Sequence, residues 1–183
     1  HMPKDYINFK GDLNEIKERF KGNNLITVGI KDKDEKISSV GNEIAEILIE
    51  LCDFLLIEAD GSKMLPLKAP ASHEPVILSN TTMIVGVAGI DSLRKSIKEI
   101  CHRPEQVCNI LRKKDYDTIN EEDIATLLSS ESGQKKHIDK CNNAEYRAII
   151  NKVDNEELLY SAEIICRYLK EKEVQGVITS YKN

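Results

Sequence analysis

The sequence predicts an α/β fold in which helices flank a mostly parallel sheet. Short apolar runs that are typical of strands recur along the chain, and stretches with helical spacing of apolar residues separate them. Because parallel strands need a crossover of a dozen or more residues, usually a helix, this alternation favours a parallel sheet. The chain has 183 residues, 40% hydrophobic and 31% charged. It is long enough for one folded domain, which we expect to span residues 3–183.

Five elements are expected before residue 60. They are, in order, a helix at 12–21, a short strand at 25–30, the second arm of a hairpin at 35–40, a helix ending at Leu51 and a buried strand at 54–57. In the first helix, Leu13, Ile16 and Phe20 recur at helical spacing. The second helix has Ser39 or Asn42 as its expected N-terminal cap.

The rest of the chain continues the alternation of strands and helices. The expected elements are a strand at 83–90, helices at 104–111 and 120–128, a strand at 146–150, a helix at 156–170 and a final strand at 174–180. Pro104 suits the first turn of its helix, and Asn120 suits the cap of the next one. We expect the region from about 104 to 143 to be a helical insertion into the sheet domain.

The composition argues against several classes of protein. A net charge of −5, from 26 basic and 31 acidic residues, gives no electrostatic reason for nucleic-acid binding. No apolar run approaches membrane-spanning length and no signal peptide is visible, so we expect no membrane association. Five cysteines without a CxxC pair argue against a disulfide framework or a zinc knuckle, and a reducing cytoplasm is the expected location. The opening His1-Met2 looks like a cloning remnant, so we expect natural sequence upstream.

The most concentrated chemistry is Glu58-Ala59-Asp60-Gly61, directly after the apolar run at 54–57. Ligands in open α/β sheets bind at the carboxyl ends of strands. A carboxylate at such a strand end holds Mg²⁺ in P-loop NTPases, often through water. Glu58 and Asp60 are therefore expected to have a catalytic, Mg²⁺-binding role, and Gly61 would let the backbone approach a phosphate. The alternative is an ordinary polar turn, because Asp-Gly is a favoured turn dipeptide.

A second motif, Asn151-Lys152-Val153-Asp154, follows the strand expected at 146–150. GTP-binding proteins use Asn-Lys-x-Asp at this place. Asp154 would accept two hydrogen bonds from the N1–H and the exocyclic amine of guanine, an edge that adenine does not offer. Lys152 would pack along the base and Asn151 would brace the loop, while Ser180 could add a contact from the last strand. Chance is the alternative, because the chain is rich in Asn, Lys and Asp.

The phosphate-binding motif that should accompany these two sites does not occur in the sequence. G-x-x-x-x-G-K-[ST] is absent, and no glycine is followed by lysine. The sequence therefore predicts a P-loop NTPase-like domain that lacks its first strand and its phosphate loop. GTP or ATP with Mg²⁺ is the expected ligand of a full-length form. The chain by itself is not expected to hydrolyse nucleotide by the usual route.

Six polar side chains in and around a proline-rich stretch are expected to bind a second substrate: Ser62, Lys68, His73, Glu74, His102 and Arg103. Three prolines within residues 66–75 make a stiff, extended path that can hold side chains in a fixed array. Lys68 and Arg103 suit an anion such as phosphate. The two histidines and Glu74 could bind a metal or move protons. The alternative is a surface loop with ordinary solvated charges.

Several of these motifs together resemble the signature of a known family. The residues that carry the resemblance are Leu56 to Ser62, Pro66 to Pro70 and His73 to Ile77, with His102-Arg103 and Asn151 to Asp154 further on. They resemble the YqeC family, accessory proteins of selenium-dependent molybdenum hydroxylases. The resemblance implies a P-loop NTPase fold and a role in maturing a molybdenum cofactor or its selenium-containing form. More distantly, Glu58-x-x-Gly61 is similar to the nickel-insertion GTPases that mature hydrogenase and urease.

Two functional hypotheses follow. The first is a cytoplasmic nucleotide-binding maturation factor that prefers GTP. The second is a non-catalytic module that carries a molybdenum cofactor or docks on the hydroxylase. We also expect self-association into a homo-oligomer, because a sheet that lacks its first strand exposes an edge, and exposed edges recruit partner chains.

Overall fold

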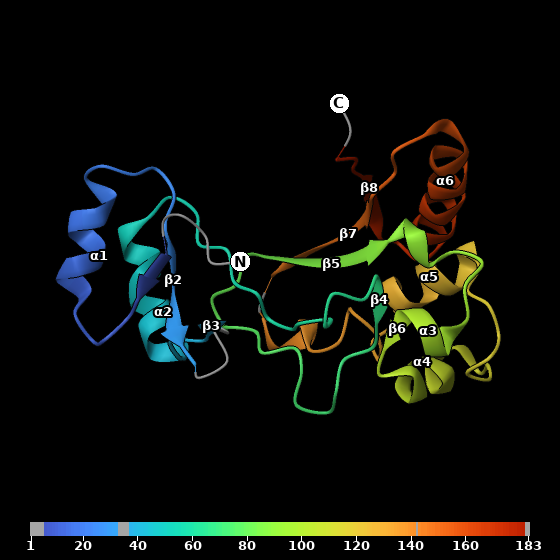
Figure 1. Ribbon diagram of the computed structural model, residues 1–183, viewed down its shortest axis with the longest axis horizontal. Coiled ribbons are helices and arrows are strands. Elements are labelled where there is room, and N and C mark those ends of the chain that lie inside the picture. Colours follow the sequence, from blue (N-terminus) through green and yellow to red (C-terminus); the bar gives the residue numbers. More distant parts are fainter. Residues whose placement is uncertain (1–5, 33–36, 142, 182–183) are drawn as a thin grey trace. The chain divides into compact units, whose positions relative to one another are not determined.

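In the computed structural model, residues 6–32, 37–141 and 143–181 are described (Figure 1). The expected cloning remnant, His1-Met2, lies outside these ranges. The chain, for which the sequence predicts one domain, forms two compact units that meet in the sequence between Ile57 and Glu58. Each unit has its own cluster of buried apolar side chains.

The first unit is a small three-stranded sheet with two helices. Its elements are β1 (Tyr6–Asn8), α1 (Leu13–Phe20), β2 (Thr27–Lys31), β3 (Ile37–Ser38), α2 (Asn42–Leu48) and the 3₁₀ turn η1 (Ile49–Leu51). The strand order is β1-β2-β3, with β1 parallel and β3 antiparallel to β2. Ile7, Phe9, Ile16 and Leu48 form its buried core. Strand β1, which is three residues long, is not predicted from the sequence.

The hairpin and both helices expected in this unit are confirmed. The Asp12 side chain caps α1 by accepting a hydrogen bond from Asn14 N. The cap expected for α2 is wrong, because Gly41 is the N-cap and its φ is 88°. The Ser39 hydroxyl instead accepts a hydrogen bond from Gly41 N, 3.1 Å away, and so shapes the turn before the helix.

The buried strand expected at 54–57 is wrong. These residues form neither strand nor helix, and the side chains of Phe54 and Leu56 are 88% and 89% exposed. A strand is stabilised by its neighbours in a sheet rather than by its own sequence. None of the described strands pairs with this segment, so an apolar run alone does not make it a strand.

The second unit contains an all-parallel sheet of three strands and a parallel pair of very short strands. Its elements are β4 (Leu67–Lys68), β5 (Met83–Gly89), η2 (Ile90–Ser92), α3 (Ile97–Ile100), β6 (Cys101–His102), α4 (Pro104–Leu111), α5 (Glu121–Ser129), η3 (Ile138–Lys140), β7 (Glu145–Asn151), α6 (Glu156–Glu171) and β8 (Gln175–Ile178). The large sheet has the order β5-β7-β8, and β4 pairs with β6. The mixed α/β class with mostly parallel strands and flanking helices is confirmed.

All the strands and helices expected after residue 80 are confirmed, each within two residues or so of the expected bounds. Local signals explain this success. Pro104 is the first residue of α4. Asn120 and Asp123 form a reciprocal capping box at the start of α5, with hydrogen bonds of 2.8 and 2.9 Å. The helices α4, α5 and η3 lie within the region expected as an insertion, and α5 packs on α6 and β5.

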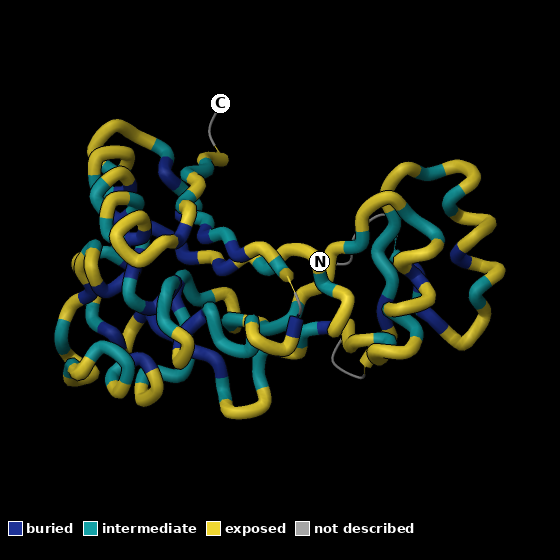
Figure 2. The backbone as a smooth tube through the Cα atoms, turned by 180° about the vertical axis from the view of Figure 1, so that it is seen from behind, coloured by how far each residue is buried: buried dark blue, intermediate teal, exposed yellow. Residues whose placement is uncertain are grey.

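The main core lies where α5 and α6 meet one face of the large sheet. Ala88, Ala148 and Ile150 from the sheet are buried there with Leu127 of α5 and Ile165 of α6. In Figure 2 the buried residues of the chain are drawn in dark blue. The helices therefore fix the strand ends, which carry the polar residues of interest.

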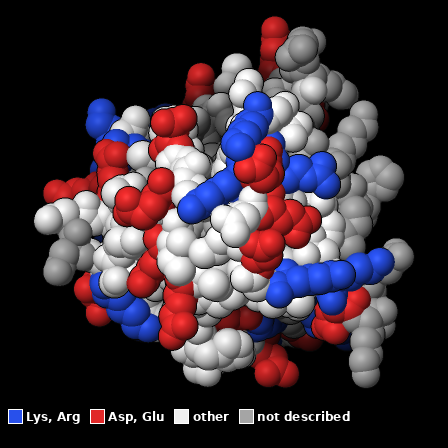
Figure 3. Space-filling view, turned by 90° about the vertical axis from the view of Figure 1, so that its left-hand side faces the viewer, with Lys and Arg blue, Asp and Glu red and all other residues white. Residues whose placement is uncertain are grey.

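Charged side chains of both signs lie close together over the face drawn in Figure 3. Of the helices that the structure describes, none has both the length and the apolar character that crossing a membrane requires.

Candidate functional site

The Asn151–Asp154 loop lies at the carboxyl end of β7, beside the carboxyl end of β8. The side-chain oxygen of Asn151 accepts hydrogen bonds from Lys152 N at 2.7 Å and from Thr179 Oγ1 at 3.0 Å. Its amide nitrogen donates to the Tyr181 hydroxyl at 3.0 Å. One side chain thus ties the loop after β7 to the segment after β8.

Asp154 is tied to the same segment. Its Oδ1 accepts hydrogen bonds from Ser180 Oγ at 2.7 Å and from Tyr181 N at 3.1 Å. The backbone also joins the two loops, because Val153 N donates to the carbonyl of Thr179 at 3.0 Å. The structure therefore brings Asn151, Asp154 and Ser180 together. We call this group, with Lys152, the base loop.

The Lys152 ammonium donates to Asp91 Oδ2 at 2.9 Å, across the end of the neighbouring strand β5. Lys152 itself has a φ of 65°, an uncommon conformation for a residue with a side chain. A Cβ at Gly89 would collide with Asp91 Oδ1 and with Pro66, so glycine is what allows the Asp91 carboxylate to fold back against the strand. Asp91 and Gly89 were not among the expected site residues, although a carboxylate two residues after a glycine-ended strand is a detectable signal.

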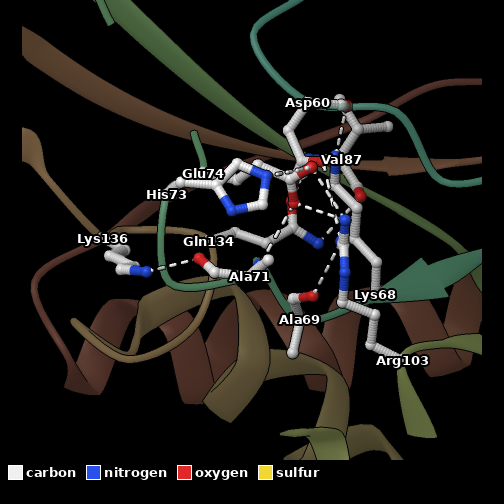
Figure 4. Close-up of polar contacts among 10 residues, drawn as sticks. All are labelled: Asp60, Lys68, Ala69, Ala71, His73, Glu74, Val87, Arg103, Gln134 and Lys136. Carbon is white, nitrogen blue, oxygen red and sulfur yellow. Dashed lines mark hydrogen bonds and ion pairs between the residues drawn. The ribbon is translucent and has the colours of Figure 1, made fainter. Parts of the chain in front are cut away.

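A second group of polar residues lies around the short pair β4 and β6 (Figure 4). The parallel register sets Lys68 opposite His102, which also brings Arg103 near the proline-rich loop. Lys68 Nζ lies 3.2 Å from Asp60 Oδ2 and also donates to the Asp60 carbonyl. The side chains of Lys68 and Asp60 are 16% and 5% exposed, so this ion pair is largely buried.

Arg103 connects Asp60 to Glu74. Its Nη2 lies 2.7 and 2.6 Å from the two carboxylate oxygens of Glu74, and its Nη1 lies 3.8 Å from Asp60 Oδ1. Nη1 also donates to the Ala69 carbonyl at 3.4 Å. Glu74 Oε2 accepts from Ala71 N at 3.1 Å. We call Asp60, Lys68, Glu74 and Arg103 the ion cluster.

The ion cluster shifts the pKa values of its two carboxyl groups in opposite directions. Burial raises the pKa of Asp60; Lys68 pulls it down, and the neighbouring Glu74 adds to the rise. Burial alone would raise the pKa of Glu74. The Ala71 N–H, Asp60 and Arg103 together have a larger effect and hold this pKa below its usual value.

The two histidines differ in their surroundings. The side chain of His73 is 74% exposed, and its Nε2 lies 3.7 Å from Glu74 Oε1. His102 is half-buried. Burial, and then the positive charges of Arg103 and Lys63, lower the pKa of His102, so it is neutral near pH 7. Both histidines stay candidates for the second-substrate site.

The two carboxylates expected at the metal lie in different surroundings. Asp60 is already engaged by Lys68 and Arg103, which compete with a cation for its oxygens, and Glu58 is exposed. Among the described residues, no group of three or more His, Cys, Asp or Glu side chains could hold a metal ion. Gly61 is exposed and Ser62 half-buried, so both are accessible to a ligand.

The ion cluster and the base loop are both attached to the end of β5. The carbonyl of Pro66, just before β4, accepts a hydrogen bond from Gly89 N at 2.8 Å. Asp91, two residues later, holds Lys152. The sequence motifs suggest two separate groups, whereas the structure places them on either side of one strand end.

Comparison with known proteins identifies relatives of this chain. The sequence model of the family described as "YqeC protein" matches residues 2–105. The "Uncharacterized protein YqeC" of Escherichia coli (strain K12) is 32% identical over 111 residues, which are 59% of this chain and 43% of the relative. The chain thus spans less than half of that relative's length. No solved structure matches the chain. The matched range contains the whole ion cluster and ends before the base loop.

Proposed function

The chain belongs to the YqeC family, and we propose that it binds a nucleotide, with guanine preferred, as an accessory factor in the maturation of selenium-dependent molybdenum hydroxylases. The nucleotide part rests on the base loop. The hydroxylase and molybdenum-cofactor part rests on the resemblance of the motifs to that class of accessory proteins.

The observation that carries the nucleotide proposal is the double hydrogen bonding of Asn151. Its side chain joins the loop after β7 to the segment after β8 through Lys152 N and Thr179 Oγ1. An Asn-Lys-x-Asp loop that reads guanine needs this bracing, because the aspartate must face the base edge in one orientation. Two donors from the β8 side, Ser180 Oγ and Tyr181 N, hold one oxygen of Asp154.

The position of the loop supports the same proposal. In open parallel sheets, ligands bind outside the carboxyl ends of the strands. The base loop, Asp91 and the Thr179–Tyr181 segment follow the carboxyl ends of β7, β5 and β8. This arrangement is the one that a P-loop NTPase-like sheet would have, and we propose that fold for the family. Since the sequence has no G-x-x-x-x-G-K-[ST] motif, we propose nucleotide binding for this chain and no hydrolysis.

We propose that the ion cluster faces the second substrate, a molybdenum cofactor or a related anionic molecule. Lys68 and Arg103 provide cationic donors that suit phosphate. Asp60 Oδ1 is buried and receives no hydrogen bond from any of the described residues, which leaves one acceptor of the ion cluster unused. His73, His102 and Ser62 border this group in sequence and are proposed as further contacts.

Isothermal titration of the chain with GTP, ATP and a pterin tests this proposal. We expect GTP to bind more tightly than ATP, and Asp154→Ala to abolish that preference. Asp139 is an exposed aspartate in η3, so Asp139→Ala is the matched control and should leave both affinities unchanged. Equal binding of GTP and ATP by the unmodified chain would remove the guanine proposal.

A second candidate is a non-catalytic module that carries a molybdenum cofactor or docks on the hydroxylase. The observation that favours it is the mutual pairing of the ion cluster, in which Asp60, Lys68, Glu74 and Arg103 neutralise one another. Binding of the pterin without any binding of GTP or ATP would support this candidate over the first.

A further inference from the structure

Among the described residues of the second unit, the helices that pack on the large sheet lie against one of its faces. Residues at even positions of β5 and β7, such as Ala88, Ala148 and Ile150, are buried against the helices. The opposite face carries Met83, Val85, Val87, Glu145, Arg147, Ile149 and Val177, which we call the open face. Of these, Met83, Val85, Val87 and Val177 are 49%, 43%, 45% and 39% exposed.

The exposed aliphatic side chains form a continuous row across the sheet. The register pairs Val87 with Ile149 and Ile149 with Val177, so three branched side chains lie side by side on three strands. Parallel sheets are almost always covered on both faces, and their strands read as nearly continuous apolar runs. The sequences of β5 and β7 have that character, although one face is open. Contiguous exposed apolar surface of this kind marks an interaction site.

The outer edge of β5 is partly closed. The carboxamide of Gln134 accepts from Val87 N at 2.8 Å and donates to the Val87 carbonyl at 3.1 Å. Gly89 N donates to the Pro66 carbonyl. These bonds occupy the groups that an added strand would need near the carboxyl end of β5. A partner is therefore better accommodated by the face of the sheet than by this part of its edge.

We propose that the open face is the interface between two copies of this chain, stacked sheet against sheet. The charges on the face favour a second copy as the occupant. Glu145 and Arg147 lie two residues apart on the central strand β7 and pair with each other, so the face carries one charge of each sign. A two-fold axis passing between them sets Arg147 of one copy opposite Glu145 of the other, because in a two-fold interface the same patch serves both subunits.

The spacing of stacked sheets suits this arrangement. Packed sheets lie about 10 Å apart, a gap that an arginine from one side and a glutamate from the other can span. The aliphatic row of Val87, Ile149 and Val177 would then interdigitate with its copy and lose its exposure to water. The proposal is independent of nucleotide binding, because none of these residues belongs to the base loop or to the ion cluster.

Light scattering of the full chain over a wide concentration range gives the first test. We expect a dimer, and we expect Val87→Lys to raise its dissociation constant by about a hundredfold or more, because an unpaired lysine at the interface loses its hydration. Tyr160→Lys is the matched control, since Tyr160 is 64% exposed on α6, away from the open face. A chain that is monomeric throughout, or a dimer that Val87→Lys does not weaken, would overturn the proposal.

Mixing two charge-reversal variants is the second test. It changes none of the aliphatic residues of the open face. Arg147→Glu leaves two acidic groups on the face, and Glu145→Arg leaves two basic ones. Each variant alone should be largely monomeric, whereas an equimolar mixture should form a heterodimer. If the mixture stays monomeric although both variants keep the circular dichroism spectrum of the parent chain, something other than a second copy covers the face.

Discussion

The side chain of Asp91 shows how single residues set the geometry of the proposed nucleotide site. One of its oxygens accepts from the Lys152 ammonium at 2.9 Å, and the other is enclosed against Gly89 and Pro66. Charge-assisted hydrogen bonds of this kind are about twice as strong as neutral ones. The carboxylate therefore holds the Lys152 side chain in one position, and in the proposed site that side chain would pack along the base.

Replacing Asp91 tests that role. Asp91→Asn keeps the shape but loses the charge, so Lys152 should be held less firmly and GTP should bind about tenfold more weakly, the equivalent of one charge-assisted hydrogen bond. Titration calorimetry measures the change, and Asp139→Asn is the control for loss of one negative charge. If Asp91→Asn binds GTP as tightly as the parent chain, Asp91 does not contribute to nucleotide binding.

Glu74 gives a prediction about pH. Its pKa lies below its usual value of 4.5 in the folded chain, so its ionised form stabilises the fold. That contribution is complete above pH 4.5 and is lost as the pH falls through the lowered pKa. Glu74→Gln should reduce the free energy of unfolding by about 2 kcal/mol at pH 7, because Arg103 loses a charged acceptor.

The measurement is urea unfolding of the parent chain and of Glu74→Gln at pH 7 and at a pH well below 4.5. The difference between the two proteins should shrink in acid, where Glu74 of the parent chain is itself protonated. A difference of the same size at both pH values would mean that the ionised carboxylate does not cause the stabilisation.

Among the elements, those with local signals were predictable and those that depend on distant partners were not. Asn120 and Pro104 begin their helices where the sequence predicts, because capping needs only neighbours in the chain. The run at 54–57 looks like a strand but lies exposed, because no described strand pairs with it. The pair β4 and β6 has two residues in each strand, too few for any periodicity to reveal.

The candidate site also has one part that the sequence predicts and another that it does not. Asn151, Asp154 and Ser180 come together because each lies at or just after the carboxyl end of a predicted strand of one parallel sheet, whose carboxyl ends share an edge. Their meeting could be foreseen from the order of the elements. The contact of Arg103 with Glu74 could not, because it depends on the unforeseen pairing of β4 with β6. Asp91 was not predicted, because its contact with Lys152 joins two residues that are far apart in the sequence and follow neighbouring strands.

The packing of α6 on β8 gives a prediction for an element. A Cβ at Gly176 would lie 2.7 Å from Cys166 Sγ and 3.2 Å from Leu169 of α6. Gly176→Ala should therefore force β8 and α6 apart and cost about 1–2 kcal/mol of stability. Gly22→Ala is the control, because no atom lies within 4 Å of the place that its new methyl group would occupy. If Gly176→Ala and Gly22→Ala change the free energy of unfolding in urea by the same amount, β8 and α6 are not closely packed.

For the molecule as a whole, the division into two compact units predicts where proteases cut. Residues 52–57 form no helix or strand, and Phe54 and Leu56 are almost fully exposed. Brief treatment with chymotrypsin should cut there first and yield a fragment of the second unit that resists further cleavage. Phe54→Ser with Leu56→Ser should slow that first cut. Early cleavage throughout the second unit would contradict the description of it as a compact body.

The central claim, that Asp154 reads guanine, is tested most directly by exchanging the base. Asparagine at this position offers one donor and one acceptor, whereas aspartate offers acceptors only. Xanthine has an oxygen where guanine has its exocyclic amine, so it matches asparagine. We predict that Asp154→Asn lowers the affinity for GTP and raises the affinity for XTP, measured by titration of both nucleotides. An Asp154→Asn variant that still prefers GTP to XTP as strongly as the parent chain would contradict the account.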